Sequence, residues 1–122
     1  MSENTGLEYE PRGLVGVLTP QANTTVEPEY AIWMPPGYAW INARMTSDKN
    51  SIAERLVDYT NALDDHMKQF ANAPVQSVAF GTTGASYLIG REREDQMIAA
   101  FQQRYGIPLV MAATAICAAL KH

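Results

Sequence analysis

The sequence has one cysteine, two histidines and no excess of positive charge, and each of these shortages excludes a class of protein. Cys117 is the only cysteine among the 122 residues, so an internal disulfide is impossible and we expect a reducing, cytoplasmic setting. The sequence contains nine Lys and Arg residues and 13 Asp and Glu residues, which gives a formal net charge of -4. This balance argues against a nucleic-acid partner, because phosphate binding needs a basic surface.

Long apolar runs are also missing, so we expect no membrane partner. The N-terminus, Met-Ser-Glu-Asn-Thr-Gly, has no basic region followed by an apolar stretch and does not resemble a signal peptide. The composition, 47% hydrophobic and 18% charged, is nevertheless typical of a globular chain. The length predicts one small domain, with residues 1–12 as an N-terminal tail and residues 13–122 as a single α/β lobe.

Strand-like and helical patterns alternate four times along the chain. The apolar run 13–18 is typical of a strand buried on both faces, and further strands are expected at 38–44, 75–80 and 107–113. Helices are expected after a cap at Thr24 or Thr25, from a capping box at Ser51 to Phe70, over 91–105, and over 114–121. The alternation predicts a four-stranded parallel sheet with helices on both faces, a flavodoxin-like lobe.

In such a sheet, ligands bind outside the carboxyl ends of the strands. The loops to inspect are therefore 19–25, 81–87, and Thr114 with its neighbours. Their tips offer hydroxyls, the amide of Asn23 and two glycines, but no Asp, Glu or His. A cradle of neutral donors suits a carboxylate or a developing oxyanion. Thr and Ser at these places are also common helix caps, so each of them has a purely structural alternative.

Three other conspicuous features favour structural roles. Cys117 lies in a helix of small residues and is expected to be a buried, inert thiol. His66 lies beside the apolar stripe of its helix without a partner at ligand spacing, so we expect a surface or hydrogen-bonded histidine and no metal site. Trp33 and Trp40 are expected in the core, with an interface as the alternative for the apolar segment 30–34.

The segment 17–29, Val-Leu-Thr-Pro-Gln-Ala-Asn-Thr-Thr-Val-Glu-Pro-Glu, resembles the opening motif of maleate cis-trans isomerases. There a strand ends in a proline turn and is followed by Asn-Thr and a Val-Glu-x-Glu helix start. Three further segments resemble the same family in the same order, at 42–45, 79–86 and 114–120. From about residue 13 onward the chain is similar to the N-terminal lobe of the aspartate/glutamate racemase superfamily, near maleate isomerase and arylmalonate decarboxylase.

The resemblance implies a two-lobed enzyme that acts on small carboxylates without a metal or organic cofactor, each lobe typically supplying one cysteine. Carried over, Pro20 and Asn23 would line a carboxylate pocket, and Thr82 and Thr83 would donate hydrogen bonds to a carboxylate or enediolate oxygen. Thr19, Ser86 and Thr114 are further candidates. Gly81 occupies the position of the family's first cysteine. Arylmalonate decarboxylase also has glycine there and relies on one cysteine of its second lobe.

The family's second lobe would begin where this chain ends. We therefore expect the N-terminal half of a decarboxylase, racemase or isomerase, inactive alone and joined by a second lobe or by copies of itself. The alternative is a non-catalytic module of the same fold that binds a carboxylate or a partner, since no titratable group stands at the predicted site. A receiver-like or flavin-binding domain is a third interpretation, but a receiver needs clustered Asp at strand ends and none occurs here.

Overall fold

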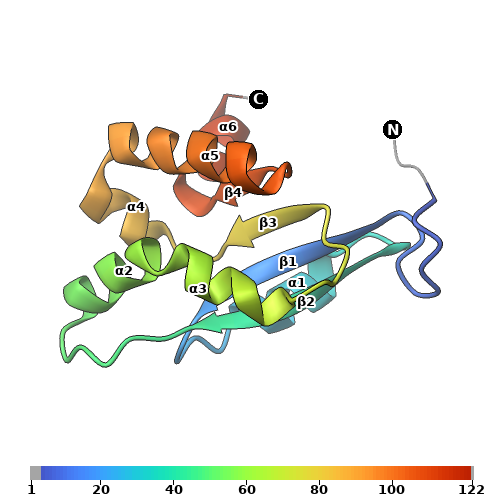
Figure 1. Cartoon of the computed structure of the whole chain (residues 1–122), viewed down its shortest axis with the longest axis horizontal. Helices are drawn as coiled ribbons and strands as arrows, with labels where there is room; N and C mark the ends of the chain where they lie inside the picture. The colour runs from blue at the N-terminus through green and yellow to red at the C-terminus, as the bar shows by residue number, and fades with distance from the viewer. Residues whose placement is uncertain (1–3, 122) are drawn as a thin grey trace.

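The computed structural model describes residues 4–121, and a four-stranded parallel sheet runs through it (Figure 1). The strands are β1 (Gly13–Pro20), β2 (Tyr38–Met45), β3 (Ser77–Phe80) and β4 (Leu109–Met111). Their order is β2-β1-β3-β4, and every neighbouring pair is parallel. The predicted parallel α/β sheet is confirmed.

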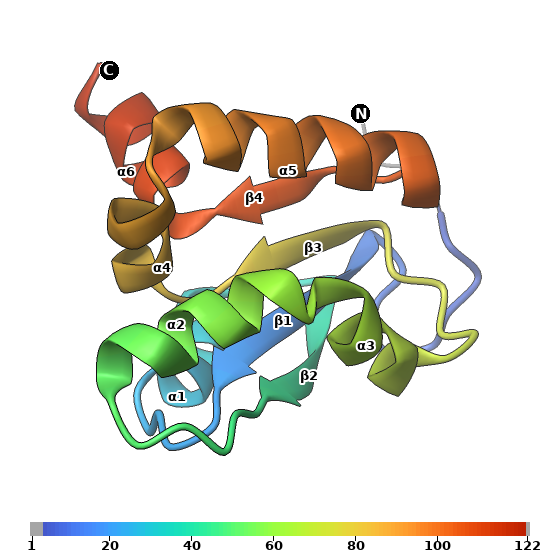
Figure 2. The ribbon, with the colours of Figure 1, turned by 60° about the vertical axis from the view of Figure 1, so that its left-hand side comes forward.

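Helices connect the strands and cover both faces of the sheet. They are α1 (Val26–Trp33), α2 (Ile52–Asn61), α3 (Leu63–Met67), the 3-10 turn η1 (Lys68–Phe70), α4 (Thr83–Ile89), α5 (Arg91–Tyr105) and α6 (Ala112–Leu120). In both views, α2 and α3 lie on one side of β1 and β2, and α1 lies on the other (Figures 1 and 2).

The main core lies between the sheet and the layer of α2, α3, η1 and α5. Alternate residues of the strands point into it, since side chains alternate between the faces of a sheet. The buried cluster includes Leu18, Met45, Val78, Phe80, Leu109 and Met111 from the strands, and Tyr59, Phe70 and Phe101 from the helices. The opposite face meets α1, where Arg44 of β2 reaches Glu27.

The helix expected from Ser51 to Phe70 is divided into three pieces. It begins as predicted, with the Ser51 hydroxyl accepting a hydrogen bond from the Glu54 amide at 3.2 Å. The chain then breaks at Ala62, which has φ -99° and ψ 20°, and continues as α3 and η1. The change of direction keeps the later apolar residues on the sheet, because Leu63, Met67 and Phe70 are all buried.

The segment after β3, expected as a polar loop, is mostly helix α4. Its small residues carry no apolar periodicity that would have predicted a helix. Gly84 allows α4 to pack closely against α2, because a Cβ at this position would lie 2.9 Å from a methyl of Leu56 on α2. The last strand is also shorter than the predicted 107–113, and α6 starts at Ala112 instead of Thr114.

Three burial predictions are wrong. Trp33, the last residue of α1, is 79% exposed. Trp40 is half-buried and packs edge-on against Tyr30, with ring centroids 6.0 Å apart. Cys117 is exposed, because α6 buries none of its described residues. His66 is buried at 5% exposure, and within residues 4–121 its Nε2 has no hydrogen-bond partner.

Two kinds of feature are absent from residues 4–121. No helix in that range is both long and apolar enough to cross a membrane. The same range contains no group of three or more His, Cys, Asp or Glu side chains that could hold a metal ion.

Burial of His66 predicts a loss of stability in mild acid. Burial lowers the pKa of His66 below its ordinary value of 6.5, and the nearby Asp65 carboxylate opposes this only in part. The unfolded chain, with an ordinary histidine, therefore takes up its proton first as the pH falls, so stability decreases below about pH 6.5. Urea unfolding at several pH values between 7.5 and 5 should show this decrease. In His66→Gln the decrease should be smaller; equal slopes in the two proteins would contradict the assignment.

Candidate functional site

A pocket of about 340 Å³ lies at the carboxyl ends of β1 and β3, where the fold predicts ligand binding. The loop between β1 and α1 supplies one wall, α2 supplies another, and the start of α4 closes the third side. The lining residues are Pro20, Gln21, Ala22, Asn23, Ile52, Arg55, Leu56, Tyr59 and Thr82.

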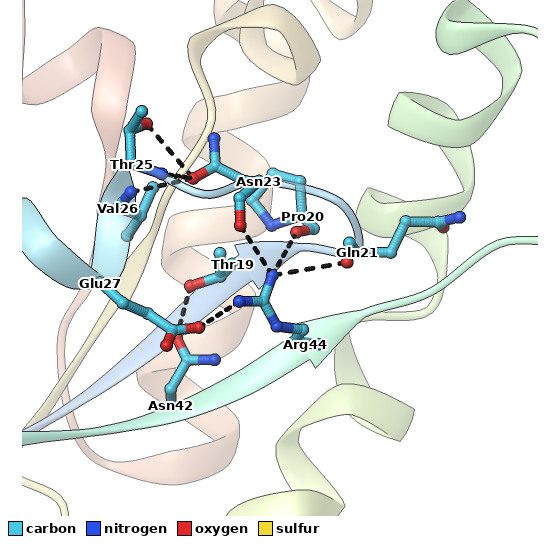
Figure 3. Close-up of polar contacts among 9 residues, drawn as sticks. All are labelled: Thr19, Pro20, Gln21, Asn23, Thr25, Val26, Glu27, Asn42 and Arg44. Carbon is cyan, nitrogen blue, oxygen red and sulfur yellow. Dashed lines mark hydrogen bonds and ion pairs between the residues drawn. The ribbon is translucent and has the colours of Figure 1, made fainter.

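Arg44 holds the loop wall of this pocket in place (Figure 3). Its Nη1 donates to the backbone carbonyl oxygens of Pro20 at 3.2 Å, Gln21 at 3.4 Å and Asn23 at 2.9 Å. Its Nη2 forms an ion pair with Glu27 in the first turn of α1. One planar guanidinium thus ties the loop to β2 and α1, which the single point charge of a lysine could not do.

Asn23 caps helix α1 and thereby fixes the other end of the loop. Its Oδ1 accepts hydrogen bonds from the backbone amides of Thr25 at 2.8 Å and Val26 at 2.9 Å. Thr25 is the N-cap residue of α1, one of the two expected positions, but its side chain makes no capping hydrogen bond and Asn23 supplies the acceptor instead. An Asn side chain two residues ahead can form this turn as well as a Thr hydroxyl can. Because Oδ1 is engaged, only the NH₂ group of Asn23 is left to donate to a ligand.

Gln21 joins the loop to α2. Its Oε1 accepts hydrogen bonds from the Ser47 amide at 2.7 Å and from the Tyr59 hydroxyl at 3.0 Å. These two bonds fix the orientation of the amide and leave its nitrogen as the donor side. The NH₂ group of Gln21 is therefore a donor held in a fixed orientation on this wall of the pocket. The Tyr59 hydroxyl already donates its hydrogen to Gln21 and has none left for a ligand.

Arg55 brings a positive charge to the pocket that the sequence had not indicated there. Its Nη2 donates to the carbonyl of Asn50 at 3.0 Å, and its half-buried side chain forms no ion pair within the part of the chain that is described. The spacing along the helix carried a signal, since the pocket residues Ile52 and Tyr59 lie three residues before and four residues after Arg55. The strand-end loops predict only part of the lining, because a face of α2 borders the same edge of the sheet.

The structure brings only some of the predicted residues together. Pro20, Asn23 and Thr82 line the pocket. Thr82 is the N-cap residue of α4, but its side chain makes no capping hydrogen bond, so its hydroxyl is not committed to the helix. Gly81 and Thr83 adjoin Thr82 without belonging to the lining. Thr19 is fully buried and donates to Oδ1 of Asn42.

Ser86 and Thr114 belong to a different cavity, of about 370 Å³, between α4, α5 and α6. There the Thr114 hydroxyl donates to the buried carboxylate of Glu94. Ser86 is buried, and among residues 4–121 its hydroxyl has no hydrogen-bond partner. Cys117 lines this second cavity and is therefore separate from the pocket at the strand ends.

Gly81 sits where the backbone leaves no room for a side chain. Its amide donates to the Leu18 carbonyl at 2.8 Å, and a Cβ on Gly81 would lie 2.9 Å from that same oxygen. The same Cβ would also lie 3.4 and 3.5 Å from the methyl groups of Val26. Any larger residue, cysteine included, would have to push β3 away from β1.

Replacing Arg44 tests its role under the loop. We expect Arg44→Lys to lower the free energy of unfolding by about 1–3 kcal/mol, because one ammonium cannot serve three carbonyls and Glu27 together. Thermal melting of the two proteins measures this. The matched control is Arg104→Lys, an exposed ion pair with Asp64 that should change stability by less than about 0.5 kcal/mol. Equal effects of the two substitutions would contradict the role given to Arg44.

Comparison with solved structures agrees with this fold. The maleate isomerase Iso from Pseudomonas putida S16 superposes with a TM-score of 0.68 at 18% identity, over 85% of this chain and 46% of that chain. A double variant of arylmalonate decarboxylase in its liganded form, with a glycine changed to cysteine and a cysteine to serine, gives 0.68 at 17% identity, over 89% of this chain and 46% of that one. No family model and no curated protein matches the sequence.

The predicted resemblance in fold is thus confirmed by the two proteins named for it. At these identities the likeness concerns the fold, and this chain spans about half the length of either structure. The chain has the fold of one lobe of maleate isomerase and arylmalonate decarboxylase, with its pocket at the carboxyl edge of the sheet.

Proposed function

We propose that the pocket at the strand ends binds a small carboxylate and supplies one half of the active site of a cofactor-independent decarboxylase or isomerase. The observation that carries this proposal is the combination of Arg55, Thr82 and the loop 20–23 in a single pocket. A second lobe, on the same polypeptide or on another, would supply the other half. The role of this chain is to bind and orient the substrate.

The donors of the pocket suit a carboxylate group. The Arg55 guanidinium offers charge-assisted hydrogen bonds, and the Thr82 hydroxyl and the Gln21 amide add neutral donors. Ile52 and Leu56 provide an apolar wall beside them. Donors held in place before the reaction would also stabilise negative charge that develops on the substrate, as in an enediolate.

The same pocket offers nothing that could transfer a proton in the physiological range. The nine residues described as its lining include no Asp, Glu, His or Cys. The crowding around Gly81 supports the proposal that this lobe binds the substrate and that another group transfers the proton. A cysteine at Gly81, the family's cysteine position, would need a rearranged sheet. We propose that a cysteine of the second lobe protonates the substrate, as the resemblance to arylmalonate decarboxylase implies.

A non-catalytic carboxylate-binding module is the alternative function. The lining has no proton donor, which is consistent with a non-catalytic module and equally consistent with one half of a two-lobed enzyme. In both cases this lobe would contribute binding groups only. The two proposals share the binding step and differ in what happens when a second lobe is added.

Binding is tested by calorimetry with phenylmalonate and maleate as probes. We expect Arg55→Gln and Thr82→Val each to raise the dissociation constant, the former by about 10- to 100-fold because it removes a charge-assisted interaction. The control is Arg93→Gln, which removes an exposed arginine outside the pocket and should leave affinity unchanged. Equal affinity in all four proteins, or no heat at saturating concentrations of both probes, would contradict carboxylate binding at this site.

Catalysis is tested by adding the second lobe of an arylmalonate decarboxylase as a separate chain or a fusion. We expect the chain alone to be inactive and the combined protein to release carbon dioxide from phenylmalonate, with loss of activity in Arg55→Gln. Carboxylate binding without turnover in any combination would instead support the non-catalytic module.

A further inference from the structure

The cavity of about 370 Å³ between α4, α5 and α6, which we call the α4–α6 cavity, has no role in the function proposed above. It shares no lining residue with the pocket at the strand ends. In Figure 2, α4 and α6 both lie at the end of α5 where that helix begins. The volume falls within the range of small-molecule sites, roughly 300–1,000 Å³. The side chains in its wall therefore need to be considered as a possible second site.

A buried carboxylate without a cationic partner lies in the wall of this cavity. Glu94 is 4% exposed and forms no ion pair within residues 4–121. Its Oε1 accepts a hydrogen bond from the Thr114 hydroxyl, and its Oε2 accepts none from the described residues. A carboxylate has about four acceptor sites, and burial of an unpaired charge is unfavourable. Glu94 can therefore accept further hydrogen bonds, most favourably from a positively charged group.

Ser86 is a second incompletely satisfied group in the same wall. Its side chain is 5% exposed, and among residues 4–121 its hydroxyl has no hydrogen-bond partner. Buried polar groups are nearly always hydrogen-bonded, so an exception needs an explanation. Two such groups, one on α4 and one on α5, border one cavity, and this indicates a polar ligand.

Two cations border the α4–α6 cavity and are also unpaired. Arg91 and Lys121 are exposed lining residues, and neither forms an ion pair within residues 4–121. Arg91 lies three residues before Glu94, so both side chains lie on one face of α5 less than one turn apart. Lys121 follows Thr114 by seven residues, which places it on the same face of α6. The lining thus combines one buried negative group with two exposed positive groups.

The rest of the lining is largely apolar. Tyr87 of α4 is 74% exposed, so its ring is available for contact with a ligand. Ala113 and Ala118 line the side formed by α6. Aromatic rings pack on one another in offset or edge-on arrangements, and small residues leave room for such a ring. This part of the cavity favours an aromatic ligand group.

We propose that the α4–α6 cavity binds an aromatic α-amino acid. The ammonium group binds Glu94, with the Ser86 hydroxyl as a further acceptor, and the aromatic ring packs against Tyr87 and α6. The carboxylate group binds Arg91 and Lys121. The two charges of an α-amino acid are close together, as are Arg91 and Glu94 on α5. A simple amine would leave both cations unpaired, and a simple carboxylate would leave Glu94 buried without a counter-charge.

Amide NMR spectra of the full chain test the proposal with three probes of similar size. L-Phenylalanine carries both charges, phenethylamine carries only the ammonium group, and 3-phenylpropionate carries only the carboxylate. We expect L-phenylalanine to shift resonances of residues 86–94 and 113–121 with a dissociation constant at least tenfold lower than that of either analogue.

Three outcomes would overturn the proposal. The first is no response to L-phenylalanine at about 10 mM, or a response confined to residues 20–23 of the pocket at the strand ends. The second is equal affinity for all three probes, since the site would then not recognise both charges. The third is a set of shifts at residues 86–94 and 113–121 that depends on protein concentration and not on the amino acid. That result would assign the α4–α6 cavity to a contact between protein chains.

Charge-neutralising variants test which group each charge meets. Glu94→Gln should weaken L-phenylalanine at least tenfold without weakening 3-phenylpropionate, because only the former has an ammonium group. Arg91→Gln should weaken L-phenylalanine without weakening phenethylamine, and its exposed position keeps this test independent of the buried contacts. Glu92→Gln and Arg93→Gln are matched controls, since both residues are exposed on α5 outside the lining. Variants that weaken all probes alike, or that behave as their controls do, would overturn the proposal.

Discussion

The guanidinium of Arg44 is the contact on which the candidate site depends. A parallel sheet places loops at its carboxyl edge, but it does not by itself fix their shape. Here one partly exposed guanidinium holds three backbone carbonyls between Pro20 and Asn23, and the ion pair to Glu27 secures the helix that follows. Asn23 and Gln21 then complete the loop by bonding α1 and α2. The pocket wall is thus built from β2 upward, and contacts within the lobe hold the loop 20–23 in place.

This construction separates binding from chemistry. The carboxyl edge offers an arginine, a threonine hydroxyl and an oriented amide, all of which can stabilise negative charge. The backbone around Gly81 is too close to that of Leu18 for a side chain, so a nucleophile or acid cannot stand at the end of β3 without a shift of the sheet. A lobe of this kind is suited to hold a carboxylate for a reacting group that approaches from outside. That arrangement underlies both the enzyme proposal and its non-catalytic alternative.

Much of the fold follows from sequence periodicity, and much of the site does not. The apolar run of β1, the capping box at Ser51 and the inward residues of α5 predict elements that the structure contains. The exposure of Trp33 was not predicted, because a local apolar pattern cannot distinguish a helix residue that packs on the sheet from one that is exposed. Arg55 was missed because its place in the pocket depends on how α2 packs beside the loop, and Ser86 and Thr114 were grouped with the pocket although α4 and α6 carry them to another cavity. The sequence motifs predict which edge of the sheet carries the polar loops. How the helices pack beside that edge determines which side chains line one pocket, and the motifs do not predict this packing.

The pocket at the strand ends is proposed as the site that binds a small carboxylate. Amide NMR spectra of the isotopically labelled chain, recorded during a titration with phenylmalonate, test this proposal. We expect shift changes concentrated at residues 20–23, 55–59 and 82–84, saturating with a single affinity. Changes confined to the cavity between α4, α5 and α6, or an unchanged spectrum at saturating ligand, would contradict it.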